Sequence, residues 1–298
     1  MELINNTAEL RQVCTVSSDL LYDRYKPHLQ SAEQILITYV GRAVVNRIKE
    51  ANQPSALEIE LRQLFRRVVG NMALFKLGQV GNVDISNVGL QRTKTDNTND
   101  AFEWQVDRLT RQLEADGLEA LEATIAFLDE HAEVFSEYIP VSPERLIRTA
   151  TLFSSHVFIR NSRLVFRSLE ASIATVEARY RRMPVIRAFL EDYPDAPSAE
   201  QREYMTNLQR AVANAAMAHA LRTQVVELTG DGVQVRSISQ VLTLNYRSSP
   251  NKDLLFSALS DYDSEAAFWL NSVLTELRPT DAGPVRTGGP QGKAIVSF

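Results

Sequence analysis

The sequence predicts a mainly α-helical fold with small β-hairpins, an α+β class built as a tandem duplication of one helix-helix-hairpin-helix module. Three observations predict it. Apolar residues recur every three or four positions over long stretches, and the same pattern returns about 144 residues later. In both copies, glycines are then followed by segments in which apolar and polar residues alternate, as is typical of β-strands. We therefore expect two domains, residues 1–140 and 141–298, in a chain of 298 residues that is long enough to fold without disulfides.

A long amphipathic helix is the first strong element of each copy. Six residues at steps of three or four lie on one helical face, and a shift of 144 again places an apolar residue at all six. The first set is Leu21, Tyr25, Leu29, Ala32, Leu36 and Tyr39, and the second is Val165, Leu169, Ile173, Val176, Tyr180 and Met183. A short capped helix is expected before each, over Thr7–Val13 and over Ser142–Phe153, the latter with Ser142 as its N-cap.

The next helix begins with the same tripeptide in both copies. Pro54-Ser55-Ala56 corresponds to Pro197-Ser198-Ala199, with the proline expected in the first helical turn. Continuing the shift of 144 pairs Leu61–Leu77 with Met205–Leu221 and Arg66 with Arg210.

After this helix, β-hairpins are predicted near residues 82–92 and 232–246, each followed by a polar loop and a last helical region. These regions are Ala101–Glu137 and Leu254–Leu277, and each is predicted to be a helix pair. Residues 279–298 are rich in proline and glycine and predict a flexible C-terminal arm. Its apolar end, residues 294–298, fits either a disordered terminus or a strand-like hook on a sheet edge.

Composition and motifs point away from an enzyme. The formal net charge of −5 argues against a protein that coats nucleic acid or anionic membrane. No segment is apolar enough to span a bilayer. A single cysteine, Cys14, excludes a disulfide framework and is expected in or near the core. The four histidines are scattered, and His219 falls on an apolar face, as a partly buried, hydrogen-bonded side chain would. We expect no catalytic residues, no metal, no cofactor and no small-molecule substrate.

Charge is distributed in blocks. Residues 113–144 contain nine acids and no Lys or Arg, whereas residues 160–187 contain seven arginines and two glutamates. Two readings stay open: solvated helix faces with pairing inside the chain, or an acidic surface of one subunit meeting a basic surface of the next. The cluster Arg179, Arg181 and Arg182, together with Arg66 and Arg210, is the candidate interface or DNA contact.

Short motifs carry a family resemblance. Thr7-Ala8-Glu9-Leu10-Arg11, then residues 19–40 with Ala32-Glu33 and Tyr39-Val40-Gly41-Arg42, resemble the opening of tailed-phage head–tail connector, or head-completion adaptor, proteins. Those are helical modules with a short helix, a long helix ending near Y-x-G and a third helix, which Leu61–Leu77 fits. The wider text is also similar to an uncharacterised family of prophage structural-cluster proteins.

The resemblance implies a non-catalytic structural subunit of a phage or prophage particle. Its partners would be copies of itself in a ring or other homo-oligomer, together with portal or tail proteins, and the resemblance leaves open a weak contact with DNA in the lumen. It implies residence in the host cytoplasm, and in the virion once assembled. The alternative is a cytosolic helical protein-binding module of unrelated role, and after that an enzyme.

Overall fold

The computed structural model describes residues 2–16, 20–80, 83–86, 89–92, 103–139, 144–224, 226–229, 232–235 and 252–277. Within these ranges the chain forms two compact units, the first running to Ser168 and the second beginning at Leu169. The predicted arm, residues 279–298, lies outside the described residues, as does the part of the second predicted hairpin beyond Val235. The predicted domain boundary at 140/141 rests on sequence similarity and stays a prediction.

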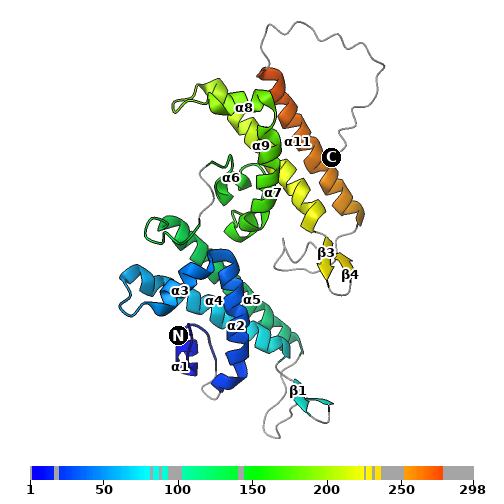
Figure 1. Cartoon of the computed structure of the whole chain (residues 1–298). Helices are drawn as coiled ribbons and strands as arrows, with labels where there is room; N and C mark the ends of the chain where they lie inside the picture. Colours follow the sequence, from blue (N-terminus) through cyan, green and yellow to red (C-terminus); the bar gives the residue numbers. More distant parts are fainter. Residues whose placement is uncertain are drawn as a thin grey trace. The chain divides into compact units, whose positions relative to one another are not determined.

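The same order of elements occurs twice along the chain (Figure 1). The first series is α1 (Thr7–Arg11), α2 (Tyr22–Val40), α3 (Arg42–Glu50), α4 (Ala56–Val80), β1 (Val83–Ser86), β2 (Gly89–Arg92) and α5 (Glu103–Glu130). The second is α6 (Ala150–Ser154), α7 (Arg163–Arg181), α8 (Pro184–Glu191), α9 (Ala199–Gln224), β3 (Val226–Thr229), β4 (Gly232–Val235) and α11 (Lys252–Glu276). The short helices α3 and α8 were not foreseen, and the described part of the last helical region of each copy holds one helix, α5 or α11, rather than a pair.

The predicted mainly α-helical fold is confirmed, but the α+β class is wrong: the described residues form an all-α fold. Among the described residues, strand pairing is confined to two antiparallel ladders of two four-residue strands each, β1 with β2 and β3 with β4. Two such strands make no layer on which helices could pack, because an isolated two-stranded ladder is marginal in water. The described hydrophobic core comes from helices and the turns beside them, so small β-hairpins are not a part of the fold class.

Three helices, α2, α4 and α5, form the centre of the first unit. The apolar stripe predicted on α2 faces inward: Tyr25, Leu29 and Leu36 are buried, against buried residues of the other helices such as Phe65 and Leu121. The equivalent stripe on α7 is buried as well, at Leu169, Ile173, Val176 and Tyr180. The shift of 144 therefore matches burial as well as residue type.

Gly41 ends α2 at the Y-x-G motif. Its φ of 87° lies in the left-handed half of backbone space, where a Cβ is strained, and its N–H bonds the carbonyl of Ile37. The chain can then leave the axis of α2 and start α3 at the next residue. In the second copy α7 ends at Arg181, and Met183 caps α8 with ordinary extended backbone (φ −74°), so that junction needs no glycine.

Helices α4 and α9 begin with matching capping boxes. Ser55 Oγ accepts from the N–H of Glu58 at 3.3 Å, and Glu58 Oε2 accepts from the N–H of Ser55 at 2.8 Å. Ser198 and Gln201 repeat both bonds, at 3.1 and 2.9 Å. Each serine is thus the N-cap, and the preceding proline lies one residue before the cap rather than in the first turn.

The capping boxes place the register of α4 and α9 at a shift of 143 rather than 144. The buried amides of Asn71 and Asn214 support this, since each donates to the carbonyl four residues earlier, of Arg67 and Arg210, at 2.9 Å. Arg66 and Arg210 are therefore not equivalent, because Arg67 holds the matching place. An apolar helix face tolerates a one-residue slip in alignment, whereas a cap does not.

The second short helix starts later than predicted. α6 begins at Ala150, where Thr149 Oγ1 accepts from the N–H of Leu152 at 3.1 Å, so Thr149 and not Ser142 is the N-cap.

In the second unit, α9 packs against α11. In the described part of the chain, no helix combines the length and apolar composition needed to cross a membrane.

Candidate functional site

The three clustered arginines lie at the C-terminal end of α7, in the second unit. Arg179 and Arg182 are exposed and Arg181 is half-buried. Three residues of separation places Arg179 and Arg182 on one side of the helix, and positive side chains at a helix C-terminus interact favourably with its dipole. The arginines thus stabilise the end of α7 and at the same time present positive charge to solvent.

His219 of α9 lies next to this positive region. Its Nδ1 is 3.1 Å from Ser172 Oγ on α7, which confirms the predicted hydrogen-bonded, partly buried histidine. Burial first, and then the positive charges of Arg179 and Arg222, hold the pKa of His219 below its ordinary value. Arg222 also forms an ion pair with Asp263 of α11. The neutral imidazole therefore serves as a hydrogen-bonding link between α7 and α9.

Arg66 and Arg210 do not join the cluster. Arg66 lies in the first unit, where its Nε donates to the carbonyl of Leu3 at 2.8 Å and its Nη2 lies 3.0 Å from Glu9 Oε1. Arg210 lies in the second unit with its guanidinium 4.6 Å from the centre of the Trp269 ring. Arg66 fastens the N-terminal segment to α4, and Arg210 fastens α9 to α11.

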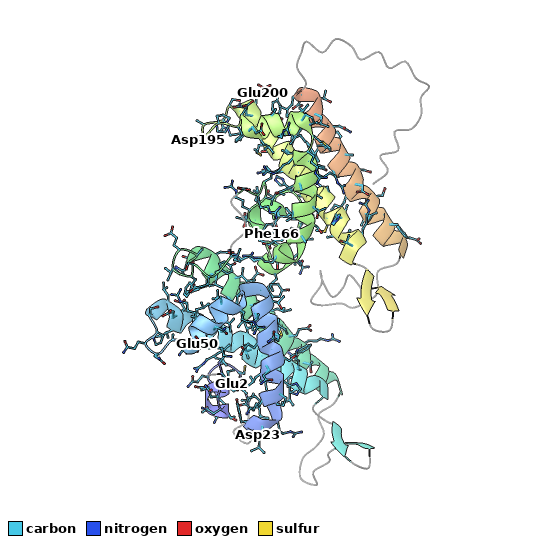
Figure 2. The ribbon with its side chains drawn as sticks, viewed as in Figure 1. Glu2, Asp23, Glu50, Phe166, Asp195 and Glu200 are labelled. Atoms are coloured by element: carbon cyan, nitrogen blue, oxygen red, sulfur yellow. The ribbon has the colours of Figure 1, made fainter. Side chains whose placement is uncertain are left out.

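The N-terminal segment has a second attachment. The hydroxyl of Tyr22 donates to Glu2 Oε2 at 2.5 Å, and Glu2 is labelled in Figure 2. Tyr25, one turn further along α2, donates to Thr7 Oγ1 at 3.2 Å. The segment before α2 is thus held by side chains of both α2 and α4.

The acidic and basic blocks meet inside the first unit. Glu122 of α5 accepts from the N–H of Arg163 at 2.5 Å and of Leu164 at 3.0 Å, and from the hydroxyl of Ser162 at 3.2 Å. A carboxylate from one helix thus caps the N-terminus of another, where backbone N–H groups and the helix dipole favour negative charge.

Asp129, two turns after Glu122, extends this contact. It lies 3.5 Å from Arg163 Nε and 3.6 Å from Arg167 Nη2, and accepts from the Tyr138 hydroxyl at 2.7 Å. Arg167 also donates to that hydroxyl, with its guanidinium 5.3 Å from the ring centre of Tyr138. Arg167 lies next to Phe166, which is labelled in Figure 2. These ion pairs support the first reading of the charge blocks, pairing inside the chain, for Arg163 and Arg167.

Cys14 is buried, as expected. Its thiol donates to Asn71 Oδ1 at 3.4 Å, and burial, with a smaller contribution from the charge of Asp116, raises its pKa to about 12. Thiolate nucleophiles in proteins have lowered pKa values, so this environment suits a structural thiol. Among the residues that the structure describes, no three His, Cys, Asp or Glu side chains gather as metal ligands.

Comparison with protein families gives a match. A family model described as "Family of unknown function (DUF6712)" matches residues 16–143 and 180–282, more than half of the chain. The chain belongs to this family. The two segments of the chain that match the DUF6712 family lie in different copies of the repeated element series. No curated protein and no solved structure matches the chain.

Sequence reasoning identified the charged blocks but missed their contact through Glu122. The block pattern carried part of the signal, because an acidic stretch precedes an arginine-rich one along the chain. Which acid caps which helix depends on the packing of α5 against residues 162–167, and no local pattern encodes that.

Proposed function

We propose that this DUF6712 protein is a non-catalytic assembly subunit, a head–tail connector or adaptor of a tailed phage or prophage particle. It would be made in the host cytoplasm and become part of the virion. The observation that carries the proposal is the helix order over residues 7–77. A short helix, α1, is followed by the long α2, which ends at Tyr39-Val40-Gly41, then by the short α3 and by a further long helix, α4. Apart from the inserted α3, this is the order that the sequence resemblance implies.

The repeated series of elements fits a ring subunit. Copies that associate head to tail need two different, complementary surfaces on each chain, and such contacts close into rings when the rotation allows. If each chain carries two modules, a ring needs half as many chains as a ring of single-module subunits with the same number of modules. Its proposed partners are copies of itself and the portal or tail proteins above and below the ring.

The association test uses the full chain at high concentration, alone and mixed with a portal protein if one is encoded near its gene. Native mass spectrometry and electron microscopy should find a discrete oligomer, with ring-shaped particles alone or on the portal. A strict monomer under all of these conditions would refute the proposal.

A contact with DNA is the weaker part of the proposal and has its own test. The cluster at the end of α7 would meet phosphates, so replacing Arg179, Arg181 and Arg182 by Ala should weaken DNA binding and lower the salt slope by up to about three, roughly one per phosphate contact. Arg66→Ala is the matched control, because that side chain is engaged with Glu9 and Leu3. Absence of wild-type binding at low salt would remove the DNA contact.

A further inference from the structure

Helices α5 and α11 hold equivalent places in the two copies. Each follows a strand ladder, and each packs against the long helix before that ladder, α4 or α9. A shift of 146 superposes Glu119-Ala120 on Glu265-Ala266 and the helix ends Glu130 on Glu276. The alanines of both pairs are buried. The two helices can therefore be compared position by position.

One stripe of α5 faces α4. A Cβ at Gly117 would lie 2.8 Å from the methyl group of Met72, and Ala120, Thr124 and Phe127 continue the stripe as buried residues. The equivalent stripe of α11 keeps this role, because Ala266 and Val273 are buried. The contact between the two long helices is thus common to both copies.

A second stripe of α5 carries two acids that contact the start of the next copy. It consists of Leu118, Leu121, Glu122, Ile125 and Asp129. Leu121 and Ile125 have no exposed surface. Glu122 and Asp129 contact residues 162–167 at the start of α7, and Leu164 there packs against the core of the first unit.

The same stripe of α11 is exposed at every position. Its residues, obtained by the shift of 146, are Ser264, Ala267, Phe268, Asn271 and Thr275. Phe268 stands where α5 has Glu122, and 62% of its surface is exposed. In α5 two acids of this face contact the chain that follows, whereas in α11, the last described helix, every position of the face is exposed.

The complementary surface is the start of α2. At the shift of 144 that relates α2 to α7, Leu21 of the first copy corresponds to Val165, the residue after Leu164, whose N–H bonds Glu122 of α5. Leu21 precedes the first turn of α2 and is 68% exposed. Phe268 and Leu21 are thus two exposed large apolar side chains, one at the position of Glu122 and the other one residue after the position whose N–H Glu122 binds within the chain.

We infer that the start of α2 of one copy of this chain docks on the exposed stripe of α11 of another copy, head to tail. The contact repeats between chains the way α7 lies on α5 within one chain, with an apolar pair, Leu21 and Phe268, in place of the polar cap. Each chain carries both surfaces, so the contact propagates into a ring or filament. This inference deepens the proposed function and rests on its claim that copies associate.

Disulfide trapping tests the pairing and its polarity. Leu21→Cys and Phe268→Cys are prepared as separate full-length variants with Cys14→Ser, mixed and oxidised. We expect a cross-linked dimer containing one chain of each kind, in excess over both homodimers. Ile59→Cys, at a half-exposed position of α4 outside the proposed contact, is the control partner for Phe268→Cys and should not cross-link. Equal yields for all pairs, or none, would overturn the inference.

A second measurement separates failure of the surface from failure of the proposed function. Phe268→Glu and Leu21→Glu should each raise the dissociation constant of the oligomer at least about tenfold, as truncation of a central apolar contact does, while Ile59→Glu leaves it unchanged. If wild type associates and both variants match it, the surface is wrong and the proposed function stands. If wild type never associates, both fail.

The remaining alternative is cover by the chain itself. Alkylation of Phe268→Cys in dilute monomer should be as fast as alkylation of Ile59→Cys. Protection of the Phe268→Cys thiol in the monomer would show that another part of the same chain occupies the stripe, and would overturn docking by a second copy.

Discussion

Removing the Glu122 cap should loosen the start of α7. Glu122 accepts three hydrogen bonds, two of them from backbone N–H groups of the first turn, and its side chain is 27% exposed. Hydrogen bonds to a charged group contribute about 1.5–3 kcal/mol each, and water can replace part of a half-buried set. We therefore expect Glu122→Ala to cost about 2–3 kcal/mol, and Glu122→Gln about 1–2 kcal/mol because one oxygen acceptor remains.

The assay is hydrogen exchange at single amides. A local loss of 2 kcal/mol corresponds to about 30-fold faster exchange, and the amides of Arg163 and Leu164 should show it first. The matched control is Glu119→Ala, because Glu119 is an exposed glutamate on the same helix. Its free energy of unfolding in urea should change by no more than about 0.5 kcal/mol. Unchanged exchange at Arg163 and Leu164 in Glu122→Ala would refute the capping role.

Three further outcomes are expected. Gly41→Ala should lower the free energy of unfolding by about 1–2 kcal/mol in urea titration, because φ is 87° there, and an unchanged midpoint would contradict this. The Cys14 thiol, with its pKa raised to about 12, should resist iodoacetamide at pH 8 in native protein and react at once in denaturant; equal rates would disprove its burial. His219 has a lowered pKa in the folded state, so the unfolded chain binds more protons as pH falls through the ordinary histidine range, and stability should drop. His219→Gln should remove part of that pH dependence of the free energy of unfolding. A variant with the same pH profile as wild type would show that His219 does not cause it.

Much of the helical framework could be predicted from local pattern. The apolar stripe from Tyr25 to Leu36 predicted α2 and its buried face, because a period of 3.6 residues places those side chains together whatever packs on them. Gly41 marked the end of that helix for an equally local reason, its positive φ. The strand-like text after each long helix misled the fold class, since alternating residues indicate extended backbone but not whether a sheet forms for helices to pack on.

The candidate surfaces were less predictable. The arginine block identified Arg179, Arg181 and Arg182, whereas Arg66 and Arg210 proved to be engaged with Glu9 and with Trp269 inside their own units. An alignment register cannot show this, because the partner of a long arginine side chain depends on which helix lies beside it.

What the sequence alone determined about this protein is its repetition: a long amphipathic helix and a second helix opened by Pro-Ser-Ala recur in the same order, with opposite charges gathered in blocks. Only the tertiary structure decided which faces of those helices are covered. Glu122 and Phe268 occupy equivalent positions, yet one is enclosed by the start of α7 and the other is exposed. The physical reason is that hydrophobic periodicity states which side of a helix is apolar, while burial depends on the segment that comes to lie against it.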